Sequence, residues 1–208
     1  MKNDCLYAAA DGNTLFPVFL KLEQLQTLIV GGGTVGLEKL TAVLQNAPRA
    51  AVTLVGTTIC PDIRNLAAEA YAVELFERPF LSCDLYGKDL VIIATENAEQ
   101  NAAIREAAKA RKILVNVADT PALCDFYLGS VVRKGNLKIA ISTNGKSPTL
   151  AKRLRELFTE AIPCELEEVM QNLGRIRDGL KGDFAHKVKE LNRITAGLVK
   201  KSSPPGER

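Results

Sequence analysis

The segment QTLIVGGGTVG, residues 26–36, decides the fold of this chain. A short apolar run at 26–31 ends in glycines, and the spacing of apolar residues from about 35 to 45 predicts a helix. Gly31, Gly33 and Gly36 fit GxGxxG, in which the first glycine allows a tight turn, the second lets the backbone approach a pyrophosphate, and the third lets the helix pack closely on the strand. The pyrophosphate would lie at the helix amino terminus, where free N–H groups and the helix dipole attract anions. We therefore predict a dinucleotide site formed by Gly31, Gly32, Gly33, Thr34, Val35 and Gly36; the alternative is a glycine-rich turn with a structural role only.

Strands and helices alternate on both sides of this segment. Further strands are predicted at 50–56, 71–77, 89–95 and 113–119 because these runs are rich in apolar and β-branched residues. Helices are predicted at 61–70, which opens with Pro61, and at 97–111, where Asn97 and Gln100 suit a helix cap. The alternation predicts an α/β fold with a Rossmann-type, doubly wound parallel sheet over residues 1–128.

The pattern changes after residue 128. Two runs, 129–135 and 137–143, are flanked by glycines and separated by one residue, which predicts an antiparallel hairpin. The chain is then helical at 148–162, 164–182 and 183–201, and the tail 202–208 is predicted to be disordered. We assign 129–160 to a second segment and 161–208 to a small helical domain with this tail.

Several polar residues fall at the carboxyl ends of the predicted strands, where doubly wound sheets bind ligands. Thr57 and Thr58 occupy the place where an acid usually accepts from the ribose 2′-hydroxyl, and no arginine stands there for a 2′-phosphate, which favours NAD over NADP. Thr95, at the end of its strand, is assigned to the same cofactor site. Asp119 could accept or relay a proton beside a substrate, or could be only a turn or capping residue before Pro121; Asp125 is a second candidate acid with the same alternative.

A basic patch follows the hairpin. Lys146, Lys152, Arg153 and Arg155 lie between residues 146 and 155 without an acid. Ser147 suits a helix cap and Pro148 the first helical position, so this helix start offers N–H groups and positive charge to a polyanion. The alternative is a well-capped surface helix with solvated cations.

Composition excludes several other classes of protein. The chain has 208 residues, of which 47% are apolar and 25% charged, which describes a globular protein. No apolar run approaches the ~20 residues that cross a bilayer, and the amino end lacks the layout of a secretory signal, so a cytoplasmic location is expected without membrane contact. A net charge of +3, 5% aromatic residues and no tryptophan do not favour nucleic-acid binding. The five cysteines are scattered and include no CxxC pair, so we expect reduced thiols. Because the chain has a single histidine, His186, we expect no metal site built on a cluster of histidines.

Four stretches together resemble a known family. FPVFLKLEQLQTLIVGGGTVGLEKL (16–40), DLVIIATEN (89–97), LVNVADTPALCDF (114–126) and LKIAISTNGKSPTLAKRLRE (137–156) are similar in order and spacing to precorrin-2 dehydrogenase, including the amino-terminal module of sirohaem synthases. The resemblance implies oxidation of precorrin-2 to sirohydrochlorin with NAD, and a homodimer whose dimerisation segment begins near Gly129. It also implies that Asp119 is essential, and that Thr143, Asn144, Gly145, Lys146 and Ser147 bind the substrate.

The sequence departs from the family pattern at two places. Glu38 precedes Lys39 where the family usually has an arginine, and Asn144 stands where a glycine is common. Some family members also insert iron into sirohydrochlorin, but the helices after Pro163 do not match strongly. A bifunctional enzyme with this ferrochelatase activity and a non-catalytic NAD(H)-sensing module therefore stay open as alternatives.

Overall fold

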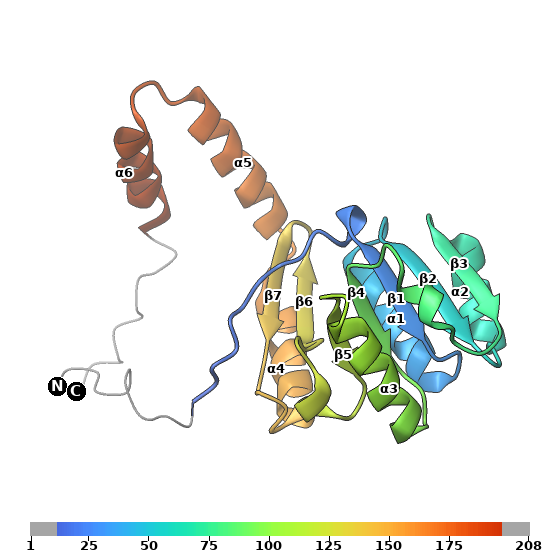
Figure 1. Ribbon diagram of the computed structural model, residues 1–208. Coiled ribbons are helices and arrows are strands. Elements are labelled where there is room, and N and C mark those ends of the chain that lie inside the picture. Colours follow the sequence, from blue (N-terminus) through green and yellow to red (C-terminus); the bar gives the residue numbers. More distant parts are fainter. Residues whose placement is uncertain (1–11, 197–208) are drawn as a thin grey trace. The chain divides into compact units, whose positions relative to one another are not determined.

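The computed structural model describes residues 12–196, which fall into two compact units divided between Leu128 and Gly129 (Figure 1). In the first unit a five-stranded parallel sheet has the order β3-β2-β1-β4-β5. Its strands are β1 (Gln26–Val30), β2 (Ala51–Gly56), β3 (Val73–Glu77), β4 (Leu90–Ile93) and β5 (Leu114–Val117). The predicted doubly wound parallel sheet is confirmed.

Helices cover both faces of this sheet. They are α1 (Thr34–Asn46), α2 (Pro61–Glu69) and α3 (Ala98–Lys109), with short 3-10 turns η2 (Leu22–Gln24), η3 (Ser82–Leu85) and η4 (Pro121–Leu123). Successive strand residues point to opposite faces. Leu28 and Val30 therefore pack in one core with Ile104 of α3, whereas Ile29 packs in the other with Leu40 of α1. Burial on both faces explains why the strands are continuous apolar runs.

The strand order reverses at β1. The chain runs from β1 outward through β2 to β3, then returns to place β4 and β5 on the other side of β1. Strand β1 is consequently hydrogen-bonded on both edges, to β2 and to β4. A crevice forms at such a switch point outside the carboxyl ends of the strands, because the connections leave in opposite directions. The glycine segment begins at this point.

The second unit contains the predicted hairpin. Strands β6 (Ser130–Lys134) and β7 (Leu137–Ile141) are antiparallel, and Gly135 takes a φ of 55° in their turn. Helix α4 (Pro148–Ala161) packs against β6, with Val132 and Ala151 buried. Helices α5 (Leu166–Gly179) and α6 (Phe184–Thr195) follow. The hairpin turn is tied to α5 because Asn136 donates two hydrogen bonds to the Glu167 carboxylate, at 2.7 and 2.6 Å.

Two strands end earlier than the sequence predicts. Strand β4 stops at Ile93 rather than at residue 95, because the Thr95 carbonyl accepts a hydrogen bond from the Asn101 side chain, 3.0 Å away. Strand β5 stops at Val117 rather than at residue 119, because the Val117 carbonyl closes a turn with the Thr120 N–H. The last part of the predicted helix 183–201 and the predicted disordered tail lie outside the described residues. No helix among residues 12–196 is long and apolar enough to cross a membrane.

Candidate functional site

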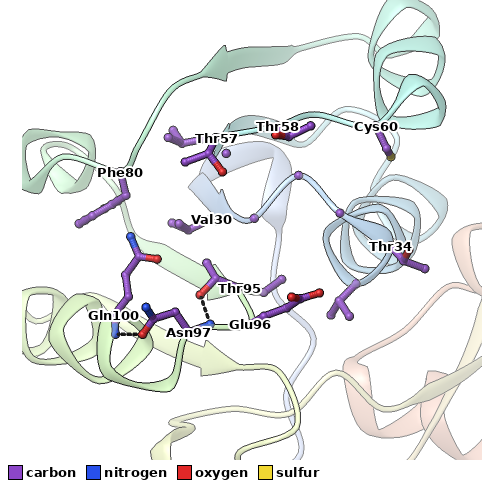
Figure 2. Close-up of a pocket in the computed structure, with 17 residues that line it drawn as sticks. Val30, Thr34, Thr57, Thr58, Cys60, Phe80, Thr95, Glu96, Asn97 and Gln100 are labelled. Atoms are coloured by element: carbon purple, nitrogen blue, oxygen red, sulfur yellow. Dashed lines mark hydrogen bonds between the residues drawn. The ribbon is translucent and has the colours of Figure 1, made fainter.

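A cleft of about 520 Å³ lies at the switch point, at the carboxyl ends of β1, β2 and β4 (Figure 2). It brings together the predicted cofactor residues Gly31, Gly32, Gly33, Thr34, Val35, Thr57, Thr58 and Thr95. Gly36 is buried behind the glycine turn and is not part of the lining. The remaining lining residues are Val30, Val55, Gly56, Cys60, Phe80, Ala94, Glu96, Asn97 and Gln100.

The glycine turn is packed from both sides. A side chain on Gly31, whose φ is 124°, would overlap the carbonyl oxygen of Ala94, and one on Gly32 would overlap that of Thr58. A side chain on Gly36 would overlap the carbonyl oxygen of Gly31, so this glycine lets α1 approach the turn. Gly33 differs from these three, because nothing lies within 4 Å of the place where its Cβ would be. Its exposed face opens to solvent and leaves room for a ligand.

Helix α1 begins at this open face without a side-chain cap. Gly33 is the N-cap residue, and no side chain accepts a hydrogen bond from the first turn of the helix. The first backbone N–H groups of a helix have no partner within the helix and carry part of the positive end of its dipole. Together with the open face of Gly33, these N–H groups fit the pyrophosphate of a dinucleotide, as the sequence predicts.

The β2 wall of the cleft carries Thr57 and Thr58, both exposed (Figure 2). The loop is held from behind by Glu77 at the end of β3, which accepts from the Ile59 N–H at 3.0 Å and from Arg64 at 2.6 Å. Both hydrogen bonds lower the pKa of Glu77, and the one from the Ile59 N–H has the larger effect. Glu77 is therefore engaged as a carboxylate that fixes the loop.

The β4 wall carries Thr95, Glu96, Asn97 and Gln100 (Figure 2). Asn97 is the cap of α3, as predicted, and accepts from the Gln100 N–H at 2.9 Å. The Thr95 hydroxyl accepts from the Asn97 N–H at 3.3 Å and donates to Asn101. Because its hydroxyl is already used, Thr95 shapes the wall of the cleft. Glu96 is the one charged residue among the described lining residues.

Phe80 lines the side of the cleft away from the glycine turn, on a loop that an ion pair holds in place (Figure 2). Arg78 donates to both Asp84 carboxylate oxygens, at 2.9 and 2.6 Å, and Asp84 also accepts from the Leu81 N–H at 2.8 Å. The Asp84 side chain is only 7% exposed. These contacts close the loop that presents Phe80.

Replacing Asp84 by asparagine is expected to lower the free energy of unfolding at neutral pH by about 1–2 kcal/mol, since it removes the charge of a hydrogen-bonded ion pair. The Arg78 hydrogen bonds hold the pKa of Asp84 below its ordinary value. The stabilisation is therefore complete above the unfolded pKa of about 3.9 and is lost as pH falls through the lower folded-state pKa. Urea unfolding at a series of pH values measures the difference between the two proteins. A difference as large at pH ~2 as at pH ~7 would contradict this role.

Asp119 follows β5 at the same edge of the sheet but does not line the cleft. The Ala118 N–H bonds the Ile93 carbonyl at 2.9 Å, which places Asp119 one residue beyond the last rung between β5 and β4. Its side chain is exposed, and its φ of 55° is left-handed, a conformation that aspartate and asparagine tolerate better than most residues. Its carboxylate is thus presented to solvent at the end of the strand.

The loop that carries Asp119 is held by the Cys124 thiol. The sulfur accepts from the Val117 N–H at 3.2 Å and lies 3.2 and 3.4 Å from the carbonyl oxygens of Val117 and Thr120, to either of which the thiol can donate. Burial raises the pKa of Cys124, so it is a neutral thiol that ties both ends of the turn. Cys60, Cys83 and Cys164 are also free thiols; Cys5 lies outside the described residues.

Asp125, the second candidate acid, is committed to the sheet. It accepts from Lys109 at 2.8 Å and from the Val115 N–H at 3.0 Å. Burial acts to raise the pKa of Asp125, but the hydrogen bonds from Lys109 and Val115 outweigh it, and the net shift is downward. Asp125 therefore ties α3 to β5.

The segment Thr143–Ser147 in the second unit forms a self-contained turn before α4. The Thr143 hydroxyl accepts from the Ser147 N–H at 3.2 Å and lies 3.1 Å from its carbonyl oxygen, and the Lys146 N–H bonds the Thr143 carbonyl at 3.0 Å. Ser147 caps α4 by accepting from Leu150, as predicted. Asn144 has a φ of 54° and Gly145 one of 74°. Asparagine replaces the common glycine here because it tolerates the left-handed region.

The basic patch is less positive than the sequence analysis predicts. Arg153 pairs with Glu156 at 2.7 Å, just outside the stretch 146–155, and the hydrogen bond from Arg153 lowers the pKa of Glu156. Lys146, Lys152 and Arg155 form no ion pair with the acids of residues 12–196. The i,i+3 spacing of Arg153 and Glu156 is the signal that could have revealed the pair.

Some residues of the site carry no local signal in the sequence. Phe80 reaches the cleft from the connection after β3, Glu96 from the connection after β4, and Gln100 from the first turn of α3. Only their place after a strand of the sheet could have suggested them. Within residues 12–196 no group of three or more His, Cys, Asp or Glu could hold a metal ion.

Two known families match parts of the chain. A family described as putative NAD(P)-binding matches residues 18–130, and one described as the central part of a sirohaem biosynthesis protein matches residues 134–161. The chain belongs to the first of these families, the putative NAD(P)-binding family. The predicted family resemblance is thereby confirmed, and the glycine turn at the start of α1 lies within the NAD(P)-binding match.

Curated relatives in this family include siroheme synthases. That of Pseudoalteromonas atlantica is 35% identical over 81% of this chain and 36% of its own length, and that of Pseudoalteromonas translucida is 38% identical over 82% and 35%. The chain thus spans about a third of the length of these relatives. The solved structure of SirC, a precorrin-2 dehydrogenase, superposes with a TM-score of 0.67 at 25% identity, covering 86% of this chain and 89% of that chain.

Proposed function

We propose that this protein is an NAD-dependent oxidoreductase that converts precorrin-2 to sirohydrochlorin in sirohaem biosynthesis. The observation that carries the proposal is the cleft at the switch point, where the open face of Gly33 meets the uncapped start of α1, in a chain that superposes on a precorrin-2 dehydrogenase. The siroheme synthase relatives support the same pathway. When bound, NAD supplies the hydride acceptor of the oxidation.

The residues of the cleft support NAD rather than NADP. The adenine ribose of a dinucleotide lies near the end of the second strand in such folds, here beside Thr57 and Thr58. No cation lies among the described lining residues to receive a 2′-phosphate, and Glu96 contributes negative charge. The threonine hydroxyls and the loop backbone are left to bind the ribose hydroxyls.

We assign proton transfer to Asp119. Oxidation at a C–H bond delivers a hydride to the nicotinamide and also requires loss of a proton from the pyrrolic system, which needs an acceptor. Asp119 supports this role because its exposed carboxylate lies at the carboxyl edge of the sheet, next to β4. Asp125 is already engaged with Lys109 and Val115.

Precorrin-2 carries many carboxylates, and we assign their recognition to Thr143, Asn144, Gly145, Lys146 and Ser147. The two left-handed residues, Asn144 and Gly145, expose the backbone of the turn, and Lys146 and Lys152 add charge at the start of α4. A positively charged helix amino terminus attracts carboxylates through its electric field, so it does not need a specific hydrogen bond to each of them.

Replacing Lys152 by glutamine is expected to raise the KM for precorrin-2 about threefold at low salt, with little change in kcat, because one partly screened attraction is lost. The difference should shrink towards zero at about 0.5 M salt. Steady-state kinetics at several salt concentrations measure both effects. The control is Lys21→Gln, which removes the same charge before β1, at the amino edge of the sheet. Equal effects of the two substitutions would contradict the assignment.

We also propose that the protein is a cytoplasmic homodimer, with 129–160 as the dimerisation segment and 161–208 as a helical domain. Leu150 and Leu157 of α4 support this assignment because they are 51% and 57% exposed. Apolar side chains that gather on one element favour an interface. Sedimentation equilibrium would give twice the chain mass for a dimer and the single chain mass if the proposal is wrong.

The decisive experiment is an anaerobic assay of the purified chain with precorrin-2 and NAD, followed by NADH absorbance. We expect NAD-dependent formation of NADH together with sirohydrochlorin. A second reaction with sirohydrochlorin and Fe²⁺ but without NAD separates oxidation from iron insertion. Iron insertion without any NADH formation in the first reaction would overturn the proposal, as would NAD binding without turnover of precorrin-2.

A further inference from the structure

Asn101 is a buried polar residue that does not line the cleft. It lies in the first turns of α3 and is 7% exposed. A buried amide is costly unless its groups are hydrogen-bonded. Its partners therefore show what its burial achieves.

Both polar atoms of the Asn101 side chain bind one residue, Thr95. Its Oδ1 accepts from the Thr95 hydroxyl at 2.5 Å, and its Nδ2 donates to the Thr95 carbonyl at 3.0 Å. The Thr95 hydroxyl also accepts from the Asn97 N–H. The position and rotamer of Thr95 are thus fixed from behind by a helix that packs on the sheet.

Thr95 in turn adjoins the glycine turn. A Cβ on Gly31 would overlap the Ala94 carbonyl and lie 3.3 Å from the Thr95 nitrogen. The Ala94–Thr95 peptide is therefore in direct contact with the residue that opens the turn. Displacement of this peptide changes the space available to Gly31, two residues before the open face of Gly33.

We propose that Asn101 is a positioning residue for the dinucleotide site, acting through Thr95 on the glycine turn. The inference rests on the proposed function only in taking NAD as the ligand. Among the lining residues, the hydrogen bonds of Asn101 reach only Thr95 and Asn97. Its effect should consequently appear in cofactor affinity rather than in the chemical step.

The test is a double-mutant cycle read by calorimetric titration with NADH. Asn101→Ala removes both hydrogen bonds to Thr95, and Thr95→Val removes the one from its hydroxyl. Each substitution is expected to raise the Kd for NADH about tenfold, since small displacements of a binding site are costly. If Asn101 acts through Thr95, the double variant binds no more than about twofold more weakly than either single variant. The kcat of Asn101→Ala at saturating NAD should stay within about threefold of the wild type.

The matched control is Ile104→Val, in the same helix. Ile104 is 2% exposed and packs in the core, so this substitution loosens α3 by about 1 kcal/mol without touching Thr95. If Asn101 has only a structural role, two variants that lose the same melting temperature should also lose the same affinity for NADH. Ile104→Val would then weaken NADH binding as much as Asn101→Ala does. That result, or additive effects of Asn101→Ala and Thr95→Val, would overturn the proposal. If the wild type binds NADH but does not oxidise precorrin-2, the proposed function fails while the titrations still decide the role of Asn101.

Discussion

Replacing Gly33 by alanine is expected to raise the Kd for NAD at least about a hundredfold while the protein stays folded. The added methyl group meets no protein atom within 4 Å and a φ of −88° suits alanine, so the stability should change by no more than about 1 kcal/mol. The methyl group would instead occupy the space in front of the first N–H groups of α1. Loss of two hydrogen bonds to a charged group, at about 1.5 kcal/mol each, gives this change in Kd. Calorimetric titration with NAD and thermal unfolding measure the two quantities.

The control for this prediction is Gly36→Ala. A side chain at position 36 would overlap the carbonyl oxygen of Gly31, so this variant should lose melting temperature as well as NAD binding. Comparing the two variants therefore distinguishes a glycine that leaves space for the ligand, Gly33, from one that allows close packing within the protein, Gly36. Binding of NAD by Gly33→Ala with wild-type affinity would contradict the placement of the pyrophosphate.

Replacing Asp119 by asparagine should reduce kcat about 10²- to 10³-fold and leave the Kd for NADH within about twofold of the wild type. The reduction is that expected for loss of a general base. Asparagine is the suitable substitution because it accepts the left-handed φ of 55° as readily as aspartate does, so the turn after β5 is preserved. Anaerobic turnover of precorrin-2 gives the rate, and titration gives the affinity.

A comparison with Asp119→Ala shows whether backbone strain contributes. Alanine disfavours the left-handed conformation of residue 119. Asp119→Ala should therefore show the same reduction in kcat as Asp119→Asn and, in addition, a lower free energy of unfolding. Turnover by Asp119→Asn at the wild-type rate would remove Asp119 from the reaction. An equal loss of NADH affinity and turnover would instead assign it to cofactor binding.

The sequence predicted those parts of the molecule that depend on local pattern. The parallel sheet follows from apolar runs such as 26–31 and 50–56, and the cap of α3 by Asn97 follows from residue type and spacing. The glycine turn was predictable because only glycine fits beside the carbonyls of Ala94 and Thr58, and because α1 can approach Gly31 only if residue 36 is also a glycine.

Contacts between distant segments could not be predicted in this way. Phe80 reaches the cleft because Arg78 and Asp84 close its loop, and nothing in the local sequence indicates where that loop will lie. The hold of Asn101 on Thr95 likewise depends on how α3 packs on the sheet. The early end of β4 has the same origin, because the Asn101 side chain binds the Thr95 carbonyl there. Strand β5 instead ends early at a local turn, closed by the hydrogen bond from the Thr120 N–H to the Val117 carbonyl.

The position of β1 at the centre of the sheet has a consequence for the mobility of the site. Its residues 28–30 are at most 2% exposed, and both of its edges are hydrogen-bonded. Amides in such a strand exchange with solvent only through large openings whose free energy approaches that of global unfolding. The amides of β1, which leads into the glycine turn, should therefore be among the most slowly exchanging of the first unit even without ligand. A nucleotide would then bind to a surface that already has its final conformation.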